Sequence, residues 1–157
     1  MRFNFTLTDS VKLFQVWCLG IIEQAGKVVL VQSAEKSMHG RWTLPGAQCV
    51  SNQSVISTTE QAIWHQLGLG VSLKEVVGWY RVPAQTGTYG SWLVACRTNL
   101  RKGALTPRHH TILNASWFSY NQIFRMPRES FCYSTIRTII KDYRKGQQAP
   151  LTSLKDA

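Results

Sequence analysis

The chain has 157 residues, which is the length of a single domain. Hydrophobic residues make up 44% of the chain and charged residues 17%. This composition allows a buried core, so the chain as a whole is not a disordered tail. Eighteen Lys and Arg face eight Asp and Glu, and the net charge of +10 favours anionic partners such as nucleotides or nucleic acid.

The N-terminal third predicts strands and a turn. Residues 11–23 and Lys27–Ser33 are rich in β-branched and aromatic side chains, so they predict a β-hairpin with buried strands. Residues 42–46 read Trp-Thr-Leu-Pro-Gly. Because the residue before a proline avoids the helical region, this stretch predicts a short extended segment that ends in a turn.

A helix follows the turn. Ser54 or Ser57 can cap its N-terminus, and Ser57 with Glu60 has the Ser-x-x-Glu form of a capping box. Gly68 can stop the helix at its C-terminus. An apolar stripe recurs at four-residue spacing, which predicts one buried face: Thr59, Ile63 and Leu67.

The second half predicts three more strands and a closing helix. Residues 71–82 and 91–100 are strong strand candidates, and residues 114–120 read as a strand that enters a turn. Residues 129–146 predict a helix with one apolar face, formed by Ile136, Ile139, Ile140 and Tyr143. The order of strands and helices indicates a mixed sheet between helices, of class α/β or α+β.

We expect residues 1–146 to form one domain and residues 147–157 to form a loosely ordered tail. No apolar run is long enough to span a bilayer, and the first residues lack the layout of a signal peptide. The cysteines form no zinc-binding spacing: Cys18, Cys49, Cys96 and Cys132. We therefore predict reduced thiols, a cytoplasmic location and no membrane partner.

Two segments carry a family likeness. Residues 20–47 give an apolar strand, a hairpin, a second strand, a loop and then Trp-x-Leu-Pro-Gly-Ala, and residues 114–123 contain Trp-Phe-Ser. Both resemble the Nudix superfamily, whose motifs there read Trp-x-Leu-Pro-Gly-Gly and Glu-x-x-Trp-Phe-Ser, and whose best-known member is the MutT-type nucleotide pyrophosphohydrolase. The resemblance covers most of the chain and implies a Nudix-type α/β/α sandwich.

The family's Nudix box reads G-x5-E-x7-R-E-U-x-E-E-x-G-U, where U is apolar. Aligned from Ala47, this sequence fits the spacing without a gap, but every charged member is replaced. The replacements are Gln53 for the first glutamate, Gln61 for the arginine, Ala62 for the next glutamate, and His65 and Gln66 for the paired glutamates. The resemblance therefore implies the fold more strongly than the activity.

The family cleaves pyrophosphate linkages with magnesium or manganese, which are hard ions that prefer carboxylate oxygens. On a helix, positions i, i+3 and i+4 share a face, so Ala62, His65 and Gln66 point together into the presumed cleft. In the family that face carries the metal-binding glutamates. Here it offers a methyl, an imidazole and an amide, so we expect little or no hydrolysis and no bound metal or other cofactor.

An active hydrolase with displaced ligands is the alternative, and it would need Mg or Mn. Glu35 and Glu129 could supply carboxylates from loops, although nothing in their spacing supports this. Glu60 lies on another side of the helix, where capping explains it better. His65 reads either as a lone metal ligand or as an ordinary polar residue, and the second reading is favoured because no partner is visible.

Three further residues are candidates for ligand binding. Arg41 stands beside the Trp-x-Leu-Pro-Gly turn and could contact a phosphate, or could be a solvated loop cation. Trp79 and Arg81 share one face of a predicted strand, where they could stack a base and hold an anion. Ordinary sheet packing of Trp79 is the plainer alternative.

The basic residues gather in two places: Arg101, Lys102 and Arg108 around a loop, and Arg137, Lys141, Arg144 and Lys145 on the last helix. The helical stripe could follow a phosphate backbone, or could be a solvated face that benefits from the helix dipole. We thus carry a nucleotide-like ligand as the first partner hypothesis. Nucleic acid or a protein partner on the basic surface remains an alternative, and a homodimer stays open.

Overall fold

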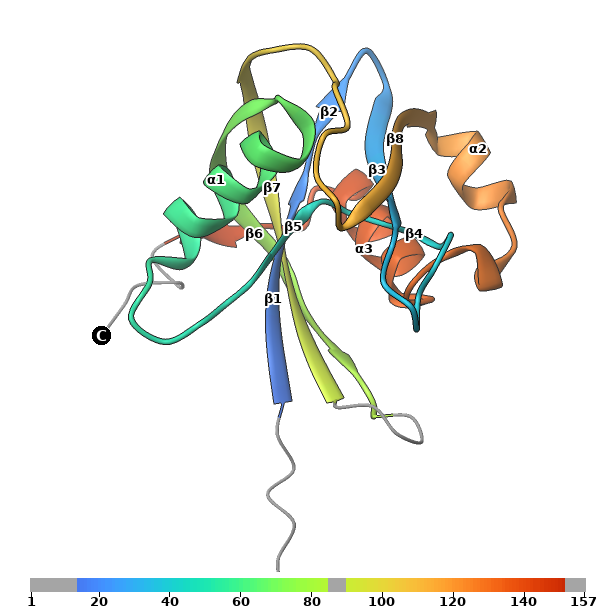
Figure 1. Ribbon diagram of the computed structural model, residues 1–157, viewed down its shortest axis with the longest axis horizontal. Helices are drawn as coiled ribbons and strands as arrows, with labels where there is room; N and C mark the ends of the chain where they lie inside the picture. Colours follow the sequence, from blue (N-terminus) through green and yellow to red (C-terminus); the bar gives the residue numbers. More distant parts are fainter. Residues whose placement is uncertain (1–13, 85–89, 152–157) are drawn as a thin grey trace, which may run out of the picture.

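The computed structural model describes residues 14–84 and 90–151 (Figure 1). The strands are β1 Phe14–Ile21, β2 Glu23–Gln24, β3 Lys27–Ser33, β4 Trp42–Thr43, β5 Gly46–Gln48, β6 Gly70–Val82, β7 Gly90–Lys102, β8 Ile112–Ser119 and β9 Ala149–Pro150. The helices are α1 Val55–Leu67, α2 Tyr120–Arg125 and α3 Thr135–Arg144, with a 3-10 turn, η1, at Arg128–Ser130. Within these described ranges, no helix combines the length and the apolar composition that crossing a membrane requires.

The strands form two sheets. The larger has the order β5-β1-β7-β6-β9, and it is mixed because β1 runs parallel to β7 while the other neighbours are antiparallel. The smaller has the order β2-β3-β4, with β8 also paired to β3. The predicted class, a mixed sheet with helices, is confirmed.

The predicted N-terminal hairpin is wrong in its first strand. β1 pairs with β5 and β7, whereas only the two residues of β2 pair with β3. The chain passes between the sheets at Ile21 and Ile22, both of which are fully buried. A continuous apolar run predicts a buried strand but not its partner. Residues 11–13 of the predicted strand lie outside the described residues.

The ends of α1 correct one prediction and confirm another. Ser54 is the N-cap and its hydroxyl accepts a hydrogen bond from the Ser57 amide, so the capping box at Ser57 does not form. The Glu60 carboxylate instead accepts a hydrogen bond from the Leu73 amide of β6 at 2.8 Å. Gly68 ends the helix with a left-handed φ of 68°, as predicted.

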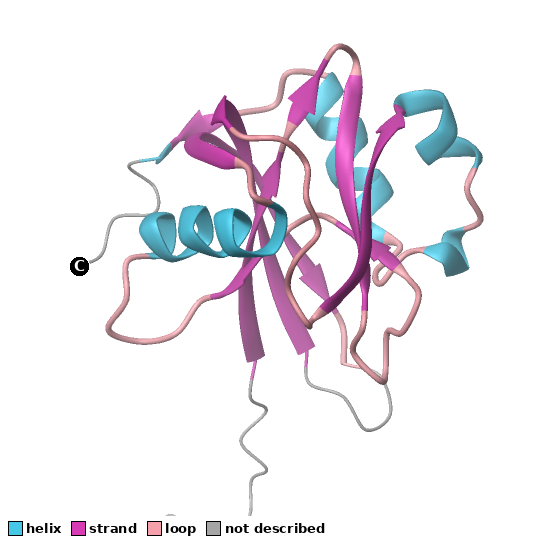
Figure 2. Cartoon of the chain, turned by 45° about the horizontal axis from the view of Figure 1, so that its top comes forward, coloured by secondary structure: helices cyan, strands magenta, loops and turns pink. Residues whose placement is uncertain are grey.

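Helices cover opposite faces of the sheets (Figure 2). The predicted stripe of α1 is buried, and its Ile63 and Leu67 pack against Ile22 and Val29. The predicted apolar face of α3 is buried in a separate cluster that includes Leu93 and Ile139. This arrangement is the expected α/β/α sandwich.

The C-terminal region differs in detail from its prediction. The segment predicted as one helix over residues 129–146 is a 3-10 turn followed by the shorter α3. α2 was not predicted; Ser119 and Gln122 form a capping box at its start. Within the predicted tail, β9 pairs with β6, and residues 152–157 lie outside the described residues.

Candidate functional site

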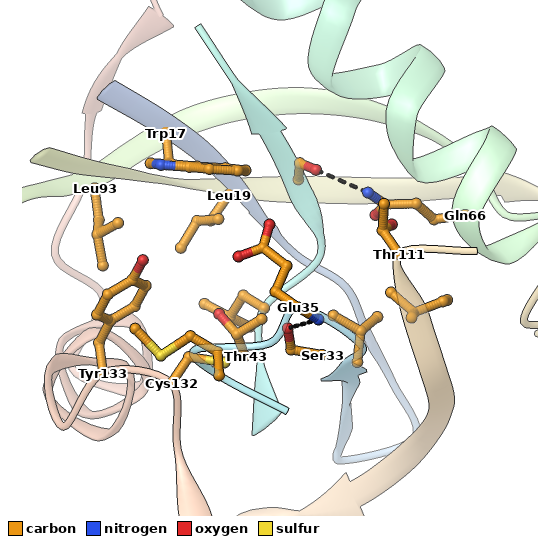
Figure 3. Close-up of a pocket in the computed structure, with 15 residues that line it drawn as sticks. Trp17, Leu19, Ser33, Glu35, Thr43, Gln66, Leu93, Thr111, Cys132 and Tyr133 are labelled. Atoms are coloured by element: carbon orange, nitrogen blue, oxygen red, sulfur yellow. Dashed lines mark hydrogen bonds between the residues drawn. The ribbon is translucent and has the colours of Figure 1, made fainter. Parts of the chain in front are cut away.

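A cleft runs beside β1, β5 and α1, where three adjoining hollows of about 100, 320 and 690 Å³ meet. Trp17 and Glu35 line all three hollows. Figure 3 shows the Glu35 carboxylate directed into the middle of the cleft, with Trp17 and Gln66 on its sides. The sequence does not predict Trp17 as a site residue, and it offers Glu35 only as a possible carboxylate from a loop.

The α1 wall contributes the three box residues that the helical spacing placed on one face. Ala62, His65 and Gln66 line the hollow of about 320 Å³ together. The Gln66 amide nitrogen donates to the Gly46 carbonyl of β5 at 3.1 Å, so this side chain ties α1 to the turn after the proline. Its amide oxygen is buried and has no hydrogen-bond partner among the described residues.

The other two box positions lie away from the cleft. Gln53 is exposed before α1, and its amide oxygen accepts a hydrogen bond from the Thr58 hydroxyl at 3.4 Å. Gln61 is exposed on α1 and donates to the Ser57 hydroxyl at 3.4 Å. Neither lines any of the three hollows.

Trp17 provides the second unpaired polar group of the cleft. Its indole N–H is buried and finds no hydrogen-bond partner within residues 14–84 and 90–151. Buried polar groups in folded proteins are nearly always paired, so an unpaired donor on a residue that lines the cleft requires an explanation. Two residues that line the cleft thus carry an unpaired buried group, a donor on Trp17 and an acceptor on Gln66.

The ligand candidates from the sequence separate in space. Arg41 is exposed and lines the hollow of about 690 Å³ together with Arg128. Trp79 is 50% exposed, and the Arg81 guanidinium lies 6.0 Å from the ring centroid of Phe14. Neither Trp79 nor Arg81 lines the cleft, so the structure does not bring them together with Arg41.

The floor of the cleft contains groups that stay uncharged at neutral pH. Burial, with a smaller contribution from Glu35, raises the pKa of Cys132 from 9.0 to about 12, although Arg41 opposes the shift. Burial also raises the pKa of Tyr133. Elsewhere in the core, the Sγ atoms of Cys18 and Cys96 lie 3.9 Å apart, and all four cysteines are free thiols.

Acidic groups are scarce in this cleft. Among the described residues, Glu35 and Glu129 are the carboxylates that line it, and Glu129 lies only in the hollow near Arg41. His109 joins His65 in lining the hollow beside α1, and a nitrogen of its ring lies 2.7 Å from the Thr111 hydroxyl. Nowhere in the described ranges do three His, Cys, Asp or Glu gather closely enough to hold a metal ion.

No signal in the sequence singled out Trp17 or His109. Trp17 lies inside a strand whose partners could not be predicted, and His109 belongs to no recognisable motif of the sequence. Glu35 could have been identified only by knowing that its loop lies beside the same hollows as Gly46 and Gln66. The positions of these three side chains at the cleft depend on tertiary structure rather than on local spacing in the sequence.

No protein-family profile and no curated protein matches the sequence. Solved structures do match. A Nudix hydrolase from Nitrosomonas europaea superposes with a TM-score of 0.82 at 18% identity, covering 92% of this chain and 98% of that one. A MutT protein from Methanosarcina mazei Go1 gives 0.75 at 15% identity, over 88% and 99% of the two chains.

A third match is the Nudix domain of Shewanella oneidensis NrtR, solved in complex with ADP ribose. Its TM-score is 0.67 at 15% identity, and the match covers 87% of this chain and 89% of that one. Identities this low establish shared architecture rather than shared chemistry. The chain has the Nudix fold.

Proposed function

We propose that the cleft binds a nucleotide-like ligand with little or no hydrolysis of pyrophosphate linkages. One observation carries this proposal: the Gln66 amide donates a hydrogen bond to the Gly46 carbonyl, at a position where the Nudix box has a metal-binding glutamate. An ionised carboxylate has no proton to donate and would face that carbonyl oxygen unfavourably. The residue therefore acts in holding α1 against β5, and the geometry favours an amide there.

The donors around the cleft do not fit a magnesium or manganese ion. Such ions take several oxygen ligands, mainly carboxylates and water. The α1 wall offers the methyl of Ala62, the imidazole of His65 and one neutral amide oxygen of Gln66, and Glu35 is the single carboxylate near the centre. We therefore derive no metal-dependent step for this chain.

The unpaired groups of the cleft suit a polar organic ligand. The Trp17 N–H can donate to a base or ribose oxygen or nitrogen, and the Gln66 oxygen can accept from a ring amine or hydroxyl. Arg41 and Arg128 line the neighbouring hollow, where they can attract the anionic part of the same ligand. ADP ribose, bound by the structurally similar NrtR domain, has both features and is a suitable first probe.

The test is calorimetric titration with ADP ribose in the presence of EDTA, using the matched variants Trp17→Phe and Trp79→Phe. Trp17→Phe removes the free donor in the cleft, and we expect about tenfold weaker binding, the upper range for one hydrogen bond. Trp79→Phe makes the same chemical change outside the cleft and is expected to leave affinity within about twofold.

Equal losses in the two variants would contradict the assignment of the ligand to this cleft. The same holds if wild-type protein binds none of ADP ribose, ADP or a nucleoside at a concentration of about 1 mM, a weak limit for a specific site. Binding that persists in EDTA separates a binding module from a metal-dependent enzyme.

A second candidate function is hydrolysis with displaced ligands, and the position of Glu35 in all three hollows is the observation that favours it. Magnesium-dependent release of AMP from ADP ribose, abolished by Glu35→Gln, would replace the first proposal with this one. A cytoplasmic location and a homodimer stay predictions; the free thiols agree with a reducing compartment.

A further inference from the structure

A second hollow, of about 760 Å³, lies between α2 and α3, and we call it the basic groove. Five cations line it: Arg128, Arg137, Lys141, Arg144 and Lys145. No carboxylate is among its described lining residues, whereas three hydroxyl side chains are: Ser134, Thr135 and Thr138. The stripe predicted on the last helix is therefore one wall of a concave site rather than a flat face.

Asp142 and Glu129, the acidic residues nearest in sequence to the cations of the groove, do not neutralise it. Asp142 accepts a hydrogen bond from the Tyr80 hydroxyl of β6 at 2.9 Å. Glu129 lines the hollow beside Arg41 and not the basic groove. Uncompensated cations around one concavity lower the energy of an anion placed there.

Two of the cations, Arg137 and Arg144, are held in place by residues of α2. Arg137 donates to the Phe124 carbonyl at 2.8 Å, and its guanidinium lies 6.0 Å from the Phe124 ring centroid. The Arg144 guanidinium lies 4.5 Å from the ring centroid of Tyr120. Fixed side chains lose less conformational entropy when a ligand binds.

The helix dipole explains the position of only some of the cations on α3. Lys141 and Arg144 lie in the last turn of α3, where the helix dipole stabilises cations. Arg137 lies in the first turn of the same helix, where the dipole disfavours a cation. A bound anion would remove that conflict.

We propose that the basic groove binds the phosphate backbone of single-stranded nucleic acid. Arg137, Lys141 and Lys145 follow one another at four-residue spacing, so their cations form a line that advances by about 5–6 Å at each step. A linear array of positive charge matches a polymer with a regularly repeated negative charge. The Phe124 ring in the same hollow offers an apolar surface against which a base can stack.

The groove suits this partner better than a membrane surface. The exposed large apolar residues of the described chain are Phe14, Val50, Trp64, Trp79 and Leu113, and none of them lines the groove. Helices that insert into the lipid headgroup region do so with apolar residues next to their cations. A hollow of this volume holds a few nucleotides of one strand.

The basic groove also adjoins the cleft. Arg128, Ser134 and Thr135 line both the groove and the hollow of about 690 Å³. A strand in the groove would therefore lead its terminal nucleotide toward the cleft. This last step rests on the proposed function of the cleft, whereas the charge argument for the groove does not.

The experiment measures fluorescence anisotropy of labelled oligothymidylate and oligouridylate of about 12 nucleotides, a length within the range of known single-strand sites. With three or four phosphates contacted, a plot of log affinity against log salt concentration should have a slope of about −2 to −3. Lys141→Glu/Lys145→Glu should weaken binding at least tenfold near 100 mM salt and make the slope shallower by about 1.4. Both lysines are exposed, so the fold should tolerate the change.

Lys27→Glu/Lys102→Glu is the matched control, because it alters the net charge equally at exposed positions outside the groove. Its affinity should stay within about twofold of wild type. Equal losses in the two double variants, or no binding by wild-type protein, would overturn the proposal. So would equally tight binding of polyglutamate, or of anionic vesicles of phosphatidylserine and phosphatidylcholine, with the same salt slope.

ADP ribose binding by Lys141→Glu/Lys145→Glu shows whether the cleft is intact. Loss of oligonucleotide binding with retained ADP ribose binding supports the groove. If the charge-reversed protein does not fold, Lys141→Gln/Lys145→Gln replaces it and should give a smaller loss in the same direction. If wild-type protein binds oligonucleotide but not ADP ribose, the proposed cleft function fails and the groove proposal stands.

Discussion

The cleft and the basic groove are built in different ways. The cleft depends on segments far apart in the sequence: the Gln66 amide donates to the Gly46 carbonyl, and Trp17 and Glu35 line the same hollows. The groove is formed by one continuous stretch, residues 124–145, and its two lysines, Lys141 and Lys145, are exposed. Substitutions in the cleft should therefore change the stability of the whole domain, whereas substitutions of these two lysines should change binding alone.

The largest expected effect comes from Gly46→Ala. A Cβ at Gly46 would lie 2.0 Å from the Cys18 carbonyl oxygen and 2.9 Å from the Leu19 Cα, so β5 would have to separate from β1. We expect a loss of at least about 3 kcal/mol in the free energy of unfolding, measured by urea denaturation. Gly26→Ala is the control: its Cβ would meet no atom within 4 Å, and its left-handed φ of 72° predicts a loss of about 1–2 kcal/mol. Equal losses in both variants would mean that the contact between β5 and β1 is less close than described.

The second largest effect is a loss of unfolding free energy at alkaline pH, caused by ionisation of Cys132 beside the cleft. The pKa of Cys132 is raised in the folded state from 9.0 to about 12, so its contribution is fully present below pH 9 and is lost as pH rises toward 12. Between pH 8 and pH 11, wild-type protein should lose about 2 kcal/mol more unfolding free energy than Cys132→Ala. Urea titrations across this range measure the difference. Parallel curves for the two proteins would show that the thiol ionises equally well when folded.

The smallest of these effects is expected for Gln66→Glu. The new carboxylate would face the Gly46 carbonyl that now accepts the amide hydrogen, and the predicted loss at pH 7 is about 1–1.5 kcal/mol. Gln53→Glu makes the same change at an exposed position and should stay within about 0.5 kcal/mol. If Gln66→Glu keeps wild-type stability and gains magnesium-dependent turnover, the amide is not required at this position and the proposed loss of catalysis is reversible by one substitution.

The sequence predicts what depends on local spacing. The face shared by Ala62, His65 and Gln66 follows from helical periodicity, and so does the burial of Ile63. Gly68 ends α1 because a left-handed residue there needs glycine more than any other type. The class of the fold and the wall of the cleft were predictable for these reasons.

The sequence could not predict contacts made by side chains across the fold. Glu60 has the spacing of a capping residue but bonds to the Leu73 amide, because β6 passes within reach of the middle of α1. Trp79 was expected to pack in the sheet or hold a ligand, yet half of its surface is exposed and it lies outside the cleft. Period-two alternation indicates which residues share a face of a strand, not whether another element covers that face.

The parallel pairing of β1 with β7 has a consequence for how the chain folds during synthesis. Phe14 is matched with Gly90 and Ile21 with Arg97, so the central strand pair joins the start of the described chain to its second half. Contacts of such long sequence separation require loop closure before they yield stabilisation, which slows folding. The ribosome must therefore release β7 before β1 can acquire its central partner, and until then the apolar β1 remains open to chaperones and to misassociation.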